Sequence, residues 1–327
     1  MNEQRQNSML LDALTCRGVL ASVNIRFWRA RKKLTPEDLG LSYDKVDDRL
    51  ISLGHKKLLP REKLQRLALV EGRAHSTLEE NSFPFLGGIA RYVPNERLED
   101  VNGKLERMRV EFENEKARFL ERYATYRDEA LGDWRRAGGK LVGDPARLVA
   151  VIEDAFPPPE KMERYFEFNI SLFEISTPEM PRAELLDAGS RREIMAAREK
   201  AAGEARHRIE QSCDEFIRES TAELRRQTSQ LCSEMLETIN TTGNIHQKTL
   251  NRLINFIDRF RELNFVNDTD MEEQLEQVRT RFLQRSAGEY RDSSSARGGL
   301  VQGLENLRNR ANEMAGEDTT AIVEQFG

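Results

Sequence analysis

The fold is decided by the segment from Leu98 to Trp134, which reads LEDVNGKLERMRVEFENEKARFLERYATYRDEALGDW. Its apolar residues recur at steps of three, four or seven, and charged residues fill most of the gaps. The stripe consists of Val101, Leu105, Met108, Phe112, Phe119, Tyr123, Tyr126, Ala130 and Trp134. This spacing places them on one face of a helix of about ten turns. A helix of that length cannot be buried in a compact core, so the stripe must lie against another part of the chain or against a partner.

A second long helix is predicted from about Arg182 to Asn240. Its apolar residues keep a near-heptad step: Ile209, Cys213, Phe216, Leu224, Leu231, Met235 and Ile239. Four polar residues interrupt this seam: Ser220, Thr221, Gln227 and Thr228. Such weak seams permit sliding or partner exchange. After a break at Gly243, two further helices are expected, over 250–260 and over 271–282, the second with a capping box at 269–272. We expect an antiparallel bundle.

Two short segments instead alternate between apolar and polar residues, as strands do. The first, Val19 to Trp28, has Val19, Ala21, Val23, Ile25 and Phe27 on one face. The second, Tyr165 to Ile175, has Phe166, Phe168, Ile170 and Leu172 on one face. Because a lone amphipathic strand is not stable, we predict that the two segments pair and bring residue 25 close to residue 170. The long helix between them then leaves and returns, as an arm does.

The composition indicates much solvated surface. Charged residues make up 33% of the 327 residues, against roughly 25% in an average domain, and aromatic residues only 7%. The net charge of −5 gives no global attraction to nucleic acid. The three cysteines, Cys16, Cys213 and Cys232, are widely spaced, which indicates free thiols in a reducing compartment. A polar N-terminus and the absence of an uncharged run long enough to span a bilayer predict a cytoplasmic protein.

The sequence contains no motif for catalysis, cofactor binding or metal binding. The histidines lie outside the spacings of zinc sites, no serine lies in a nucleophile elbow, and no phosphate-binding loop is present. The apolar segment from Phe83 to Ile89 contains two adjacent glycines and is interpreted as a structural turn, with a ligand loop as the alternative. We therefore predict no catalytic, cofactor-binding or metal-binding residue, and a protein that is not an enzyme.

A basic cluster follows the first predicted strand. Five cations and two aromatic residues lie within eight positions: Arg26, Phe27, Trp28, Arg29, Arg31, Lys32 and Lys33. The cluster is either a solvated strand end, a surface for an acidic protein partner with Trp28 as anchor, or a surface that grips phosphates and stacks a base. We take a protein partner ahead of nucleic acid. The candidate partner-binding residues are Arg26, Trp28, Arg29, Arg31, Lys32 and Lys33.

A second candidate interface lies on the long helix. Phe119, Tyr123 and Tyr126 belong to its apolar stripe and are the bulkiest residues in it between 113 and 130. We expect them to face another helix, either within this chain or in a second copy of it.

The order and spacing of several short segments resemble a bacterial and phage family of unknown function. The segments are Ser52-Leu53-Gly54-His55-Lys56-Lys57, Phe85-Leu86-Gly87-Gly88 with Val93-Pro94, Phe119-Leu120-Glu121-Arg122-Tyr123, Phe166-Glu167-Phe168, Lys248-Thr249-Leu250-Asn251-Arg252-Leu253 and Phe256-Ile257-Asp258-Arg259-Phe260. The resemblance covers most of residues 19–285. One departure is Ile89, which stands after the glycine pair where the family pattern has an aromatic residue, with Tyr92 in a shifted register.

The resemblance implies partners rather than a catalytic residue. The family is encoded in phages and mobile elements, often beside a MoxR-type AAA+ ATPase and a cobaltochelatase-like protein with a von Willebrand factor A domain. A member is therefore expected to be the third component of an ATPase and adaptor system.

These observations predict a mostly α fold with an elongated long-helix arm, a helical bundle and a small antiparallel β element. Residues 1–180 should form an α+β base with the arm at about 97–136, residues 181–290 an antiparallel helical or coiled-coil region, and residues 291–327 a flexible link, short helix and tail. The expected function is a non-enzymatic adaptor or scaffold of the ATPase system in phage or mobile-element conflict. A nucleic-acid-binding protein that uses 26–33 and a membrane-acting helical protein are the alternatives, and the lack of a long apolar segment weighs against the latter.

Overall fold

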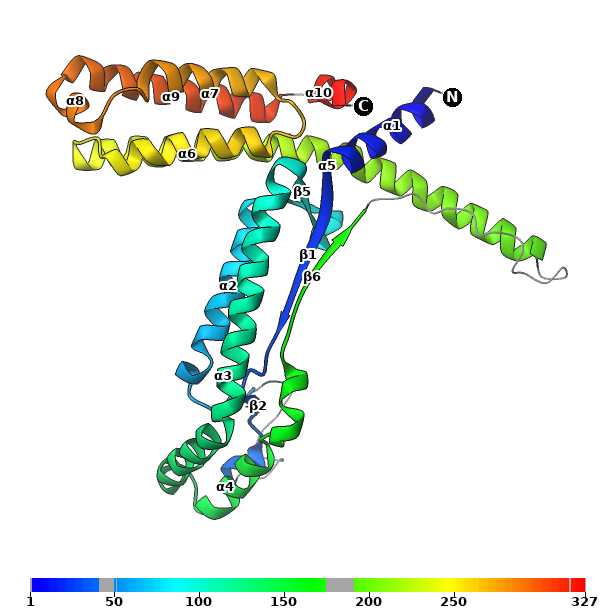
Figure 1. Cartoon of the computed structure of the whole chain (residues 1–327), viewed down its shortest axis with the longest axis vertical. Helices are drawn as coiled ribbons and strands as arrows, with labels where there is room; N and C mark the ends of the chain where they lie inside the picture. The colour runs from blue at the N-terminus through cyan, green and yellow to red at the C-terminus, as the bar shows by residue number, and fades with distance from the viewer. Residues whose placement is uncertain (1, 41–49, 51, 175–190, 318, 327) are drawn as a thin grey trace. The chain divides into compact units, whose positions relative to one another are not determined.

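The computed structural model describes residues 2–40, 50, 52–174, 191–317 and 319–326, and it is mostly helical with a small antiparallel sheet, as the sequence predicts (Figure 1). The α-helices are α1 (Asn2–Arg17), α2 (Gln65–Glu80), α3 (Asn95–Leu141), α4 (Pro145–Asp154), α5 (Arg191–Thr242), α6 (Gln247–Leu263), α7 (Thr269–Phe282), α8 (Ala287–Asp292), α9 (Ser294–Gly316) and α10 (Thr320–Phe326). The strands are β1 (Gly18–Arg26), β2 (Arg31–Lys33), β3 (His55–Lys57), β4 (Phe83–Phe85), β5 (Ala90–Pro94) and β6 (Glu167–Phe173). Short 3-10 helices are η1 (Pro36–Leu39), η3 (Arg61–Lys63), η4 (Leu86–Gly88), η5 (Pro159–Lys161) and η6 (Glu163–Tyr165).

The chain divides into two compact units. The first comprises Met1–Ala21, Asn81–Glu99 and Leu172–Gly327, and the second comprises Ser22–Glu80 and Asp100–Ser171. The predicted start of the second long helix, 182–190, lies outside the described residues, as does the end of the predicted strand at Ile175. The remainder of that helix is α5.

The helical part of the first unit is an antiparallel arrangement. α5, α6 and α7 follow one another with short turns between them, and α9 packs along α5 and α7 (Figure 1). Gly243, at φ 69°, ends α5, because this left-handed conformation costs glycine little. α6 has six buried apolar residues on one face, which explains why it lies between its neighbours.

β4, β5 and the start of β1 form the sheet of the first unit, with Gly18 opposite Pro94 and Phe83 opposite Tyr92. The rings of Tyr92, Phe216 and Phe265 pack together at centroid distances of 4.8–5.7 Å, and the Tyr92 hydroxyl donates a hydrogen bond to the Leu14 carbonyl at 2.8 Å. Burial raises the pKa of Tyr92. The segment predicted as a structural turn therefore contains a strand, whose phenylalanines are core residues.

The pairing predicted between the two alternating segments is confirmed. β6 lies next to β1 in the sheet order β4-β5-β1-β6, and the two strands run in opposite directions (Figure 1). Arg26 also forms an ion pair with Glu167 at 2.9 Å. Phe168 is buried and its ring lies 5.6 Å from that of Phe112 on α3. The apolar face of β6 thus covers part of the helical stripe.

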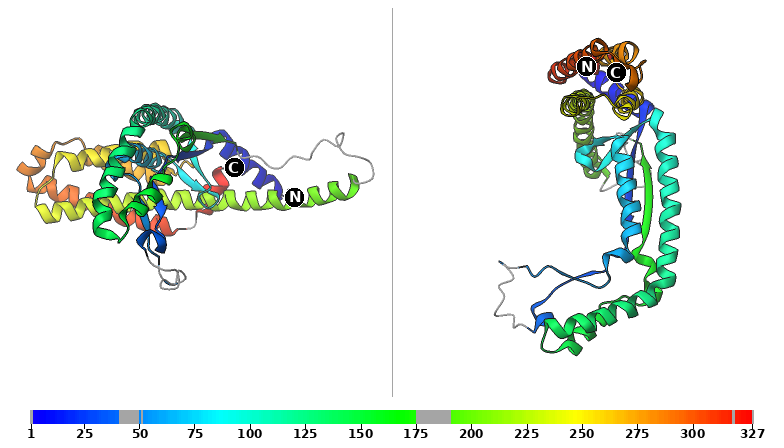
Figure 2. Two further views of the ribbon diagram at one scale, coloured as in Figure 1. Left: turned by 90° about the horizontal axis from the view of Figure 1, so that it is seen from below. Right: turned by 90° about the vertical axis from the view of Figure 1, so that its left-hand side faces the viewer.

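Within the second unit, α2 runs beside α3, and both views in Figure 2 keep them adjacent. Ion pairs join the two helices at Arg66–Glu115 and Arg73–Glu111, while buried Leu67, Val70 and Ala74 line the inner face of α2. This arrangement gives the long stripe of α3 a partner inside the chain, which is what its length requires.

Helices cover most of the described residues of the predicted link at 291–299 and of the tail. Ser293 caps α9 by accepting a hydrogen bond from the Ala296 N–H, and the serines and glycines that follow are helical. Further along α9, Gly303 has to be small, since a Cβ there would clash with the Phe282 ring on α7. In the tail, the Phe326 ring packs 5.9 Å from Phe265, and Arg17 lies over it. Close packing overrides the low helix propensity of glycine.

Candidate functional site

The second unit presents a two-stranded antiparallel ribbon made of β2 and β3. Its three cross-strand pairs are Arg31 with Lys57, Lys32 with Lys56, and Lys33 with His55. Each position on one strand therefore faces a cation or a histidine on the other. Like charges directly opposite one another on neighbouring strands are destabilising, so the exposed pair of Arg31 and Lys57 opposes the folding of the ribbon.

Five side chains of this ribbon are exposed: Arg31, Lys32, Lys33, His55 and Lys57. We call these five the basic ribbon. Within the described part of the chain, none of them forms an ion pair. Sequence reasoning found the β2 half of this set and missed the β3 half, because three residues are too few to show a strand period.

Lys56 is the exception, and it anchors the ribbon. Its Nζ lies 2.7 Å and 2.6 Å from the two carboxylate oxygens of Asp38 in η1, and both side chains are at least 93% buried. Burial raises the pKa of Asp38, but the hydrogen bonds from Lys56 and the Thr35 backbone outweigh it, so the pKa lies below its ordinary value. The pair is therefore ionised at neutral pH and fixes β3 to η1.

The backbone that leads into β2 is strained. Ala30 has φ of 49°, in the left-handed region that a residue with a Cβ avoids, and its side chain is buried. Its carbonyl accepts a hydrogen bond from the Leu58 N–H at 2.7 Å. This bond closes the end of the ribbon, so the strain is offset by local contacts.

Two predicted site residues, Arg26 and Arg29, already have partners. Arg26 pairs with Glu167, and Arg29 forms a two-pronged ion pair with Glu71 on α2 and lies 3.9 Å from the centroid of the Phe27 ring. Their charges are therefore matched within the unit. Of the six predicted residues, Arg31, Lys32 and Lys33 are the cations that have no acidic partner among the described residues.

Trp28 does not lie on the surface of the cluster, which corrects its expected role as an anchor for a partner. It is 7% exposed, and its ring packs at 5.7–6.3 Å from those of Phe119, Tyr123 and Phe156. Such an aromatic cluster buries a large apolar area and stabilises the unit. A local sequence pattern does not reveal this burial because the partners are about 90–130 residues away in the chain.

The predicted arm residues Phe119, Tyr123 and Tyr126 are brought together. Phe119 contacts Tyr126 and Phe166, and the Tyr123 hydroxyl donates a 2.6 Å hydrogen bond to the Pro157 carbonyl. Burial raises the pKa of Tyr123 to about 12. Apart from contacts within α3 itself, Phe119 and Tyr123 contact non-helical segments of the same unit, whereas the sequence suggested another helix.

Basic residues of η5 and η6 extend the positive surface near β2. Arg164 donates a 3.3 Å hydrogen bond to the Tyr165 hydroxyl oxygen, and this bond has the largest effect on the pKa of Tyr165. Against the effect of burial, this bond and the charges of Arg164, Lys32 and Lys161 lower the pKa of Tyr165. Two regions distant in sequence, β2 and the segment with Lys161 and Arg164, thus contribute positive charge near Tyr165.

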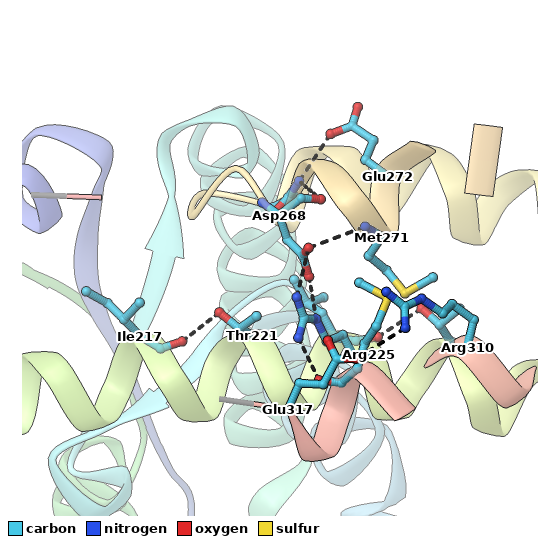
Figure 3. A network of polar contacts seen from close by, with 12 residues as sticks. Ile217, Thr221, Arg225, Asp268, Met271, Glu272, Arg310 and Glu317 are labelled. Atoms are coloured by element: carbon cyan, nitrogen blue, oxygen red, sulfur yellow. Dashed lines mark hydrogen bonds and ion pairs between the residues drawn. The ribbon is translucent and has the colours of Figure 1, made fainter. Parts of the chain in front are cut away.

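A different ionic network lies in the first unit and was not apparent from the sequence. Arg225 on α5 is 4% exposed and binds both carboxylate oxygens of Asp268, at 2.7 Å and 3.1 Å, and donates to the Met314 carbonyl on α9 at 2.6 Å (Figure 3). Asp268 is the N-cap of α7 and accepts the Met271 N–H, whereas the sequence suggested that the cap lies at Thr269. Every charge in this pair is matched, so the network ties three helices together and offers nothing to a ligand.

Three further observations concern metal binding, membrane-spanning helices and the reactivity of a cysteine. Among the described residues, no group of three or more His, Cys, Asp or Glu side chains could hold a metal ion. In the same part of the chain, no helix combines the length and apolar character needed to cross a membrane. Cys232 is buried, which raises the pKa of its thiol to about 12.

Comparison with known proteins gives one result. The model of a family described as "Protein of unknown function (DUF3150)" matches residues 16–287. No curated protein and no solved structure matches the chain significantly. The matched range contains the basic ribbon, the long helices α3 and α5, and the helices α6 and α7. Over this range the resemblance to a family of unknown function is confirmed. The chain therefore belongs to the DUF3150 family of proteins of unknown function.

Proposed function

We propose that this protein is an adaptor that docks an acidic surface of a partner protein on its basic ribbon. The observation behind the proposal is the basic ribbon, in which exposed Arg31 faces exposed Lys57 beside two further exposed lysines, without an acidic partner among the described residues. Such a pattern costs stability in the isolated protein. A negatively charged partner would remove that cost on binding and would be steered to the ribbon by its field.

The resemblance to phage and mobile-element proteins suggests which partners to test. Families of this kind are encoded beside a MoxR-type AAA+ ATPase and a cobaltochelatase-like protein with a von Willebrand factor A domain. The protein would then connect these two components, with the basic ribbon as one docking surface and the antiparallel helices of the first unit as scaffold.

Nucleic acid is the second candidate ligand, because exposed Arg and Lys also bind phosphates. Two observations favour a protein instead. The net charge of −5 gives no broad basic surface, and the burial of Phe27 and Trp28 withdraws both aromatic residues of the predicted cluster 26–33 from base stacking.

The test is a binding measurement with the purified ATPase and A-domain protein encoded beside the gene in its native host. Changing Arg31, Lys32 and Lys33 to Glu should weaken binding to at least one of them by about tenfold or more at physiological salt. The effect should be larger at low salt, where charges are less screened.

A control with the same change in net charge separates a local effect from a global one. Arg107, Arg109 and Arg118 are exposed residues of α3 in the same unit, and their replacement by Glu should leave binding nearly unchanged. Equal binding by both triple variants would overturn the proposal. Loss of oligonucleotide binding alone in the ribbon variant would establish the nucleic-acid candidate instead.

A further inference from the structure

An apolar groove adjoins the basic ribbon at Lys57. It has a volume of about 260 Å³ and lies between the segment that follows β3 and the end of α3. Its apolar walls come from Leu58, Pro60, Trp134, Ala137 and Leu141. The volume is smaller than the roughly 300–1,000 Å³ of sites for small molecules, so the groove suits one or two side chains. Leu141 stands at its rim and is 60% exposed, which is costly for a large apolar side chain that has no partner.

Two hydrogen bonds fix the groove to the ribbon. The Trp134 Nε1–H donates to the Lys57 carbonyl at 3.1 Å, and the Leu58 N–H donates to the Ala30 carbonyl at 2.7 Å. A side chain bound in the groove would therefore lie next to Lys57, which faces Arg31 across the ribbon. One ligand can contact both features.

The charged residues around the groove determine which sign of charge the ligand should carry. Asp133 lines the groove, but its carboxylate is paired with Arg136. Lys57 also lines it and forms no ion pair within the described residues. The unmatched charge at the groove is thus positive, and it continues into the rest of the basic ribbon.

The walls distinguish a peptide from nucleic acid. Leu58, Pro60, Ala137 and Leu141 are aliphatic, which suits a leucine-like side chain, whereas base stacking needs open aromatic faces. Trp134 is the aromatic member, and the hydrogen bond from its indole N–H to the Lys57 carbonyl holds the ring as one wall of the groove.

We propose that the groove and the basic ribbon together bind a short acidic segment of a partner protein, with one aliphatic side chain in the groove and flanking carboxylates on the ribbon. This inference rests on the proposed function and adds the chemistry of the recognised segment. The apolar side chain would supply affinity, and the carboxylates would supply orientation and a fast association rate.

The experiment uses the full chain and two fluorescein-labelled dodecapeptides of Asp, Glu and Ser that differ at one central residue, Leu or Ala. Binding is followed by fluorescence anisotropy at low salt. The Leu peptide should bind about fivefold tighter than the Ala peptide, because the open groove buries only part of the leucine. Ala137→Gln fills the groove without changing charge and should abolish this difference. Ala117→Gln, an exposed position elsewhere on α3, should preserve it.

The outcomes separate the groove from the adaptor function. Equal affinities for the two peptides would overturn the groove inference, while the adaptor proposal would still be decided by the purified partners. Tighter binding of a single-stranded oligonucleotide of the same charge would also overturn it. A Leu preference that persists in Ala137→Gln would place the apolar contact elsewhere and contradict the inference.

Discussion

The basic ribbon and the Arg225 network place similar cations in opposite circumstances. Arg225 is buried, donates hydrogen bonds to both carboxylate oxygens of Asp268 and donates a third to the Met314 carbonyl. Arg31 is exposed and faces Lys57. The first arrangement matches the charge of the cation at the cost of desolvation, and the second leaves exposed cations without an acidic partner among the described residues. A cation with a full set of partners supports the fold, whereas one placed opposite another cation is available for a partner.

Lys56 makes the same contrast within one ribbon. It faces Lys32 across the strands but turns into the unit and pairs with Asp38. Its neighbour Lys57 is exposed. Adjacent lysines in a three-residue strand thus have different roles, because alternate side chains of a strand point to opposite faces.

The largest effect should come from the buried network. Arg225→Leu leaves the Asp268 carboxylate buried without its counter-charge and should lower the free energy of unfolding by about 3–5 kcal/mol. Urea unfolding followed by far-UV circular dichroism measures it. Arg226→Leu is the control, since Arg226 is exposed and its one ion pair among the described residues is with Glu223, one turn away. This change should lower the free energy of unfolding by about 0.5 kcal/mol or less. Equal costs would contradict the distinction between matched buried and exposed cations.

Lys56→Met should lower the free energy of unfolding by a smaller amount, about 2–3 kcal/mol, because Asp38 keeps its hydrogen bond from the Thr35 N–H. Both tryptophans, Trp28 and Trp134, lie in the second unit, so their fluorescence during urea unfolding reports on it. The neighbouring change Lys57→Met should have little effect on this transition.

The same pair predicts a pH dependence. The pKa of Asp38 is lower in the folded protein than in the unfolded chain, so its stabilisation is fully present above about pH 4 and is lost as the pH falls through the folded value. The stability difference between the parent and Lys56→Met should therefore shrink in acid. A difference that stays constant from pH 7 to pH 3 would mean that the ion pair does not hold the ribbon.

A gain is expected from Ala30→Gly. Glycine adopts the positive φ at this position without the clash that a Cβ makes, and the variant should be more stable by about 1 kcal/mol, less the entropy that glycine gains in the unfolded chain. Ala137→Gly, in helix α3, is the opposite control and should lose about 1 kcal/mol. Destabilisation by Ala30→Gly would show that the buried methyl group matters more than the strain.

The long elements of this fold could be predicted from sequence, because periodicity accumulates over many residues. The stripe from Val101 to Ala130 specified α3, and two alternating segments specified the β1–β6 pairing. Strands of three residues, such as β2, β3 and β4, contain too few positions to show a period. They depend on partners that are distant in sequence.

The candidate site shows the same limit. The run of cations at 29–33 marked β2, but the pairing with His55–Lys57 and the burial of Trp28 are long-range contacts. In α9 the local pattern is misleading in another way, because its serines and glycines suggest a linker although the segment is a helix. Gly303 of this helix fits closely against Phe282. Local propensity gives way to packing in each of these places.

The most direct test of the central claim, that the basic ribbon serves binding and not folding, is the free energy of unfolding of the second unit in variants at Arg31. Arg31→Gln removes one of two facing cations, and Arg31→Glu places a carboxylate opposite Lys57. Followed by tryptophan fluorescence at low salt, the stability should rise from the parent to Arg31→Gln and again to Arg31→Glu, by about 0.2–1 kcal/mol in total. A loss of 1 kcal/mol or more in both variants would show that Arg31 supports the fold and would contradict the account.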